Sequence, residues 1–177
     1  MNSTEAIAER ADPTQGVAAA APRVRGWWSV FGIGCLAGLA WAVLTGLSLP
    51  PFSLWIVGLL APMPIVAAGW WTPRAWACAF GVTVGSLPLW IFHHSWVSAV
   101  SFAGVFPMIG YLAMWSGLTV LVLAKVRRVA GVLGPAVVAP TAWVGLEFVR
   151  GEIAFEGYAW FLAGHPLIEA EVVARAA

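Results

Sequence analysis

The stretch Trp27–Phe52 reads W-W-S-V-F-G-I-G-C-L-A-G-L-A-W-A-V-L-T-G-L-S-L-P-P-F and contains no charged side chain. It belongs to a longer run without Asp, Glu, Lys or Arg, Gly26–Pro73, and two more such runs follow at Ala75–Ala124 and Val129–Leu146. A helix that crosses a bilayer needs about 20 consecutive apolar residues. The first two runs are therefore long enough for two crossings each, and the third run is long enough for one.

The composition agrees with this pattern. The 177 residues are 61% hydrophobic and only 10% charged, and the mean hydropathy is +0.87. A soluble globular chain carries about 25% charged residues. We therefore predict an all-α fold, a polytopic transmembrane bundle of about five spanning helices. The net charge of +1 and the lack of a basic stripe argue against a nucleic-acid partner.

Prolines divide the apolar runs into helices. We expect the five spans at about 27–49, 53–71, 75–96, 102–124 and 132–150. Pro50 and Pro51 mark a chain reversal, because proline lacks an N–H and restricts the residue before it. Pro62 and Pro64 predict a kink inside the second helix. The last helix carries Pro140, and its start could lie nearer to that residue.

Small residues lie inside two of the predicted helices. Glycine pairs spaced four residues apart let helices approach closely, and they occur in the first and third helices at Gly34/Gly38 and Gly81/Gly85. Cys35 and Cys78 lie in the same two helices. We interpret both cysteines as small packing residues, since their number and spacing support neither a disulfide nor a metal pair.

Basic residues alternate between the connections of the predicted helices. The N-terminal tail, the second-to-third connection and the fourth-to-fifth connection carry them, at Arg10, Arg23, Arg25, Arg74, Lys125, Arg127 and Arg128. The other two connections have none. Because Lys and Arg stay on the cytoplasmic side, the N-terminus is predicted to be cytoplasmic and everything after the last helix external. Residues 1–25 are polar and Ala-rich, and we expect a disordered cytoplasmic tail.

Charge enters the last helix in the stretch Trp143–Trp160, W-V-G-L-E-F-V-R-G-E-I-A-F-E-G-Y-A-W. At about 100° per residue Trp143, Glu147 and Arg150 lie at about 0°, 40° and −20°, and so share one helix face. Ionisable groups at membrane depth are costly and suggest a functional site. The alternative is an ion pair that anchors the helix end at the interface. No serine, cysteine or lysine follows Glu147, so no nucleophile–base pair is visible.

The three histidines give no metal site in the sequence. His93 and His94 are adjacent and would point about 100° apart on a helix, so they cannot both bind one metal ion unaided. We interpret them as interfacial polar residues beside Trp96. His165 lies in a turn-like G-H-P setting and is expected to be an exposed loop residue. No metal ion and no cofactor are predicted.

Three motifs carry a family resemblance: L-P-P-F-S-L-W at Leu49–Trp55, W-x-x-x-E-x-x-R-G at Trp143–Gly151 and G-Y-A-W at Gly157–Trp160. In this order, across roughly residues 27–168, the chain resembles the N-terminal membrane domain of the apolipoprotein N-acyltransferases. The resemblance implies an enzyme of the bacterial inner membrane. That family moves an acyl chain from a phospholipid to the amino group of a diacylglyceryl-modified cysteine on an apolipoprotein. The transfer proceeds through a thioester on a cysteine, which works with a glutamate and a lysine in a nitrilase-like domain.

The resemblance assigns seven residues to an outer segment that lines a lipid cleft or meets the catalytic domain, namely Trp143, Glu147, Arg150, Gly151, Gly157, Tyr158 and Trp160. It assigns no catalytic residue. The sequence ends at Ala177, where the family continues into the nitrilase-like domain; the only lysine is Lys125, and both cysteines lie in predicted helices. The expected partners are membrane phospholipid, the apolipoprotein substrate and a separately encoded nitrilase-like half.

These observations predict a membrane domain at 26–160 and a short non-spanning tail at 161–177. We expect a truncated, frameshifted or split acyltransferase that is inactive alone. The alternative is a small polytopic scaffold or transporter-like protein without acyl transfer. A transporter should carry ionisable groups at mid-membrane, and the first four predicted helices carry none. For Glu147 we expect a replacement by alanine to disturb the placement of the last helix rather than a proton transfer.

Overall fold

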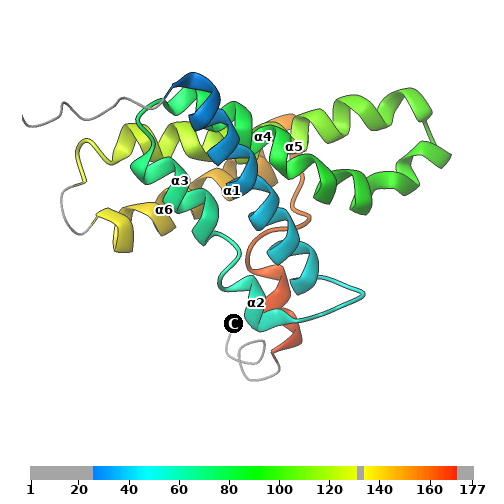
Figure 1. The fold of residues 1–177 in the computed structure, drawn as a ribbon. Coiled ribbons are helices and arrows are strands. Elements are labelled where there is room, and N and C mark those ends of the chain that lie inside the picture. The colour runs from blue at the N-terminus through cyan, green and yellow to red at the C-terminus, as the bar shows by residue number, and fades with distance from the viewer. Residues whose placement is uncertain (1–25, 131–133, 171–177) are drawn as a thin grey trace, which may run out of the picture.

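The computed structural model describes residues 26–130 and 134–170, and in these residues it contains helices and no strands (Figure 1). The α-helices are α1 Trp27–Ser48, α2 Trp55–Gly58, α3 Met63–Trp71, α4 Ala75–His94, α5 Phe102–Val126 and α6 Gly134–Phe148. Shorter turns are η1 Ser95–Ala99, η2 Val149–Ile153, η3 Ala154–Glu156 and η4 His165–Glu169. The predicted all-α helical bundle is confirmed. The predicted tail at 1–25 lies outside the described residues.

Three segments of the described chain are long and apolar enough to cross a membrane: α1, α4 with η1, and α5. The second predicted helix is interrupted next to the prolines where the kink was expected. It consists of α2 and α3, with a turn at 59–62 between them. Pro64 lies in the first turn of α3, where the missing N–H has no helical partner to lose. The prolines therefore end one helix and start another.

α1 and α4 pack most extensively against each other and run parallel. Three glycines of α1 lie against successively later residues of α4, in the pairs Gly34–Cys78, Gly38–Val82 and Gly46–Leu89. A Cβ on Gly34 would come within 2.4 Å of the Cys78 carbonyl oxygen, so the two backbones touch directly. Because α1 and α4 begin at the same end of the bundle, the α2–α3 segment must return the chain across it.

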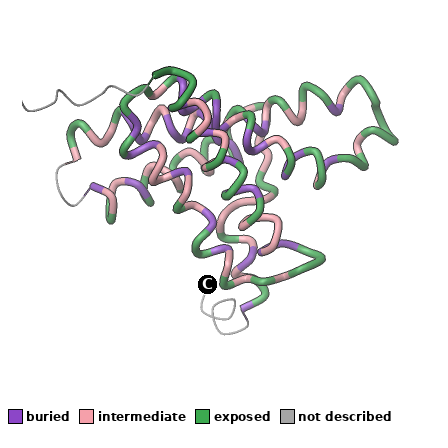
Figure 2. Tube along the Cα trace, in the orientation of Figure 1, coloured by how far each residue is buried: buried purple, intermediate pink, exposed green. Residues whose placement is uncertain are grey.

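The last helix lies close to the expected 132–150. α6 begins at Gly134 and ends at Phe148, and it continues directly as the π-helical turn η2, with Pro140 inside α6 rather than at its start. The tip of the hairpin formed by α4, η1 and α5 projects from the bundle (Figure 1), and most of this tip is exposed (Figure 2). Many apolar side chains on the outside are exposed, among them Trp28 and Trp76, as expected for a surface that faces lipid.

Candidate functional site

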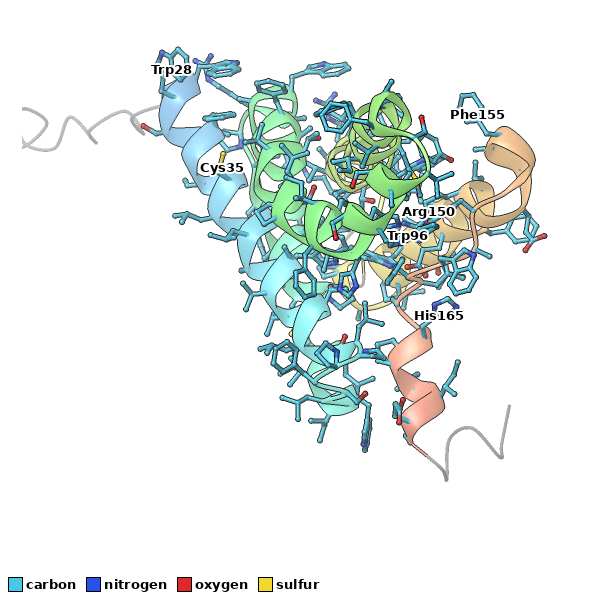
Figure 3. The ribbon with its side chains drawn as sticks, turned by 90° about the vertical axis from the view of Figure 1, so that its right-hand side faces the viewer. Trp28, Cys35, Trp96, Arg150, Phe155 and His165 are labelled. Carbon is cyan, nitrogen blue, oxygen red and sulfur yellow. The ribbon has the colours of Figure 1, made fainter. Side chains whose placement is uncertain are left out.

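Arg150 lies in η2 and is almost fully buried, with 5% of its surface exposed. Its Nη2 donates to the carbonyl oxygens of Trp160 at 3.2 Å and Phe161 at 3.3 Å. Its own carbonyl accepts from the Tyr158 amide at 2.9 Å. The chain therefore folds back after η2, and Arg150 holds residues 158–163, which we call the return segment. Figure 3 shows Arg150 inside the molecule and Phe155 at its edge.

Glu147 lies one helical turn before Arg150 and binds the same segment. Its Oε1 accepts from the backbone N–H of Ala163 at 2.8 Å. The hydrogen bonds of both charged side chains thus go to the backbone of the return segment and not to each other. The interpretation of Glu147 and Arg150 as an ion pair at the helix end is therefore wrong about their partners. The return segment lies within reach of both side chains, and its backbone N–H and carbonyl groups bind them.

The turn that brings the chain back depends on Gly157. Its φ is +90°, and a Cβ there would come within 2.2 Å of the Gly151 carbonyl oxygen. Only glycine meets both conditions without strain. Gly151 itself is buried against Ala159. The two glycines of the R-G and G-Y-A-W motifs therefore lie together in one turn.

The interpretation as an interfacial residue is wrong for His94. It is 1% exposed, its Nδ1 lies 3.1 Å from the Trp90 carbonyl oxygen, and its Nε2 is hydrogen-bonded to the Tyr158 hydroxyl. A carbonyl only accepts, so Nδ1 carries the proton and Nε2 of the neutral ring accepts from the phenol. Burial raises the pKa of the Tyr158 hydroxyl, and the charge of Arg150 opposes part of this rise. The phenol is therefore protonated at neutral pH and able to donate.

The remaining histidines and cysteines make none of the hydrogen bonds that hold the return segment. His93 packs its ring 4.9 Å from that of Phe161. His165 begins η4 and is half-buried, not in an exposed loop as expected. Cys35 is half-buried, Cys78 is buried, and both are free. Over residues 26–130 and 134–170 no group of three or more His, Cys, Asp or Glu could hold a metal ion.

A small cavity of about 40 Å³ lies where α1, α4, α5, α6 and the return segment meet. Trp143, Glu147 and Arg150, which the sequence places on one helix face, line it together. The other helices and the return segment contribute Trp41, Trp90, Trp115, Ser116, Thr119 and Phe161. We call this the Trp–Arg cavity. The sequence did not predict these contributors, because the spacing of single tryptophans on separate helices does not indicate which of them meet.

The seven residues that the resemblance singles out thus have three different settings. Trp143, Glu147 and Arg150 line the cavity, while Gly151, Gly157 and Tyr158 form or hold the turn. The Trp160 side chain is 67% exposed, and only its carbonyl oxygen contacts Arg150. The described geometry suits binding and positioning, and it offers no paired nucleophile and base at the cavity.

Replacing Glu147 with alanine should loosen the return segment, because the Ala163 N–H would lose its acceptor. We expect a loss of about 1–2 kcal/mol in the free energy of unfolding, the usual cost of an unpaired polar group of this kind. Glu147→Gln keeps an acceptor oxygen and should lose less than half of that. Thermal unfolding in detergent measures both variants. Equal losses for alanine and glutamine would show that the charge, and not the hydrogen bond, matters.

The apolar helices define a polytopic α-helical membrane protein. Glu147 and Arg150 form a polar site at the end of α6. Residues 41–177 match the family described as apolipoprotein N-acyltransferase N-terminal domain, and the chain belongs to this family. A search of the curated proteins finds no match to the chain.

Proposed function

We propose that the chain is the membrane domain of an apolipoprotein N-acyltransferase in the bacterial inner membrane. In this role it holds phospholipid, and the apolipoprotein substrate beside it, for N-acyl transfer in lipoprotein maturation. The observation that carries the proposal is the return segment, held by Glu147 and Arg150 within the region that matches the family. This segment lies where the W-x-x-x-E-x-x-R-G and G-Y-A-W motifs meet.

The proposed orientation has a cytoplasmic N-terminus and an external return segment. Two features support it. Arg127, after α5, donates to the carbonyl oxygen of Trp70 near the end of α3, so the two basic connections lie at one end of the bundle. Arg150 and the return segment instead pack beside Trp90 and His94, at the far end of α4. Basic ends stay in the cytoplasm, which would leave the site at the outer face, on the side where lipoproteins mature.

The chemistry of the transfer would come from a nitrilase-like part, on the same or another polypeptide. The thiol of Cys78 is buried between helices, 3.8 Å from the Ala68 carbonyl oxygen, and Lys125 is at the basic end of α5. Neither lines the Trp–Arg cavity. A thiolate nucleophile needs an activating base or cation close by. We therefore assign binding and positioning to this chain, and thioester formation to the nitrilase-like part.

Complementation of an acyltransferase-depleted bacterium tests this assignment. Three strains would carry this chain alone, a nitrilase-like domain of the family alone, or both. We expect growth and triacylated lipoprotein only in the strain with both. Activity of the chain alone would contradict the division of labour. No activity in the combined strain, with both parts present in the membrane fraction, would contradict the proposed function.

A further inference from the structure

The end of the bundle opposite the return segment carries a cluster of positive charges. We call it the basic end; its two connections contribute Arg74, Lys125, Arg127 and Arg128. The side chain of Arg127 donates to the Trp70 carbonyl oxygen, so the connection after α5 reaches the end of α3. No Asp or Glu occurs between residues 13 and 146, and residues 1–25 contain three acids and three arginines. Neither region therefore supplies a net negative charge to the basic end.

An apolar groove of about 450 Å³ runs from the basic end between α1 and α3. The start of α1 and the end of α3 lie on the same side of the molecule (Figure 1). Val30 and Trp71 line the groove there, and Ala37 and Pro64 line it about two helical turns further along, at a depth of about 10 Å. Leu36 and Trp71 are mostly exposed, so the groove opens to the outside of the bundle, where lipid chains lie. Its lining suits an acyl chain.

The mouth of this groove lies beside basic residues from both connections. Thr72 and Pro73 line the mouth, and Arg74 follows them directly. The Thr72 hydroxyl accepts from the Arg74 backbone N–H at 3.2 Å, and the Arg74 side chain is exposed. Arg127, from the other connection, is bound to the carbonyl oxygen of the residue before Trp71. A molecule in the groove would therefore meet positive charge where it leaves the groove.

The groove and the charges together select one chemistry. A groove without charge accepts the chain of any lipid, and basic side chains alone attract any anion, including free phosphate. Basic pockets between transmembrane helices on the cytoplasmic side are typical sites for anionic lipid headgroups. In a zwitterionic lipid the ammonium group offsets the phosphate, so the basic residues attract it less. A lipid with a net negative charge uses both features.

We propose that an anionic phospholipid of the leaflet at the basic end binds here, with its phosphate at Arg74 and Arg127 and one acyl chain in the α1–α3 groove. The lipid contacts both helices and thereby stabilises the short helix α3 against α1. This site lies at the opposite end of the bundle from the Trp–Arg cavity and takes no part in acyl transfer. It goes beyond the proposed function, and its test needs no acyltransferase activity.

The test compares phosphatidylglycerol, which is anionic, with phosphatidylcholine that has identical acyl chains. The purified full chain in uncharged detergent micelles is titrated with each lipid, and native mass spectrometry counts the retained lipid. We expect phosphatidylglycerol to bind about tenfold tighter, as for two cations near a headgroup. Arg74→Gln should reduce this preference to about threefold. Arg128→Gln removes the same charge at a residue whose chain neighbours do not line the groove, and it should leave the preference unchanged.

Ala67→Leu tests the position of the acyl chain. Ala67 lines the groove, and leucine has a similar helix propensity but fills more of the space. We expect phosphatidylglycerol to bind about threefold weaker or more, while the lipid-free variant unfolds at the same temperature as the unmodified chain. Inorganic phosphate should not displace the lipid from the unmodified chain, because phosphate has no chain for the groove.

Each of these arms can overturn the inference. Equal binding of the two lipids would mean that the basic end has no anionic lipid site. Equal loss of the preference in Arg74→Gln and Arg128→Gln would mean that the summed charge of the basic end, and not a site at the groove, attracts the lipid. Displacement by inorganic phosphate would indicate a site for free anions. Unchanged binding in Ala67→Leu would place the acyl chain outside the groove.

Discussion

Replacing Gly85 of α4 with valine is expected to separate α1 from α4 and to prevent the bundle from folding stably. A Cβ at Gly85 would lie 2.2 Å from the Cys35 carbonyl oxygen and 2.9 Å from the Leu39 nitrogen. Both neighbours are backbone atoms of α1 and cannot rotate away, so the helices must move apart. Overpacking of a rigid contact costs about 1–3 kcal/mol or more, and we expect about 3 kcal/mol or more here, because the contact is backbone on backbone.

The matched control for this substitution is Gly32→Val in α1. A Cβ at Gly32 meets nothing within 4 Å, although the residue lies in the same helix pair. The change in helix propensity is the same in both variants. The difference between their free energies of unfolding therefore measures the cost of the α1–α4 backbone contact. The free energy of unfolding, measured by titration of detergent-solubilised protein with SDS, gives that difference. Equal stability of the two variants would contradict the parallel α1–α4 contact.

Replacing Arg150 with methionine is expected to release the return segment. The substitution keeps most of the side-chain volume but removes both hydrogen bonds to the carbonyl oxygens of Trp160 and Phe161. Hydrogen bonds from a charged donor contribute about 1.5–3 kcal/mol each. Removing a buried charge also recovers desolvation energy, and we therefore expect a net loss of about 2–3 kcal/mol. Arg150→Lys keeps the charge without the planar fork, so it should restore only part of the loss.

Hydrogen exchange reports this release at particular amides. The Tyr158 N–H donates to the Arg150 carbonyl and the Ala163 N–H donates to Glu147, so both should exchange faster in the methionine variant while amides of α1 and α4 stay protected. Arg128→Met removes a charge from an exposed position beyond α5 and serves as the control. Unchanged exchange at Tyr158 and Ala163 would mean that Arg150 does not hold the return segment.

The amino-acid sequence determined the fold class and most helix positions. Charge-free runs of known length specify apolar helices, because the bilayer thickness and the rise per residue are constants. α1 and α4 accordingly begin where the first two runs begin, at Trp27 and Ala75. The sequence also determined that Trp143, Glu147 and Arg150 share a face, since that follows from helical geometry alone. The family motifs at the same residues led to the family that residues 41–177 match.

The tertiary structure alone decided which partners these residues have. Pro62 and Pro64 predict an interruption, but only the structure shows its extent, the turn at 59–62 between α2 and α3. His94 could lie at the interface or in the core, and its bond to Tyr158 joins residues 64 positions apart. Glu147 and Arg150 could pair with each other, but the chain returns within reach of both. Such contacts depend on how distant segments pack together. The spacing of residues along the chain predicts which residues share a helix face, but not which segments contact each other.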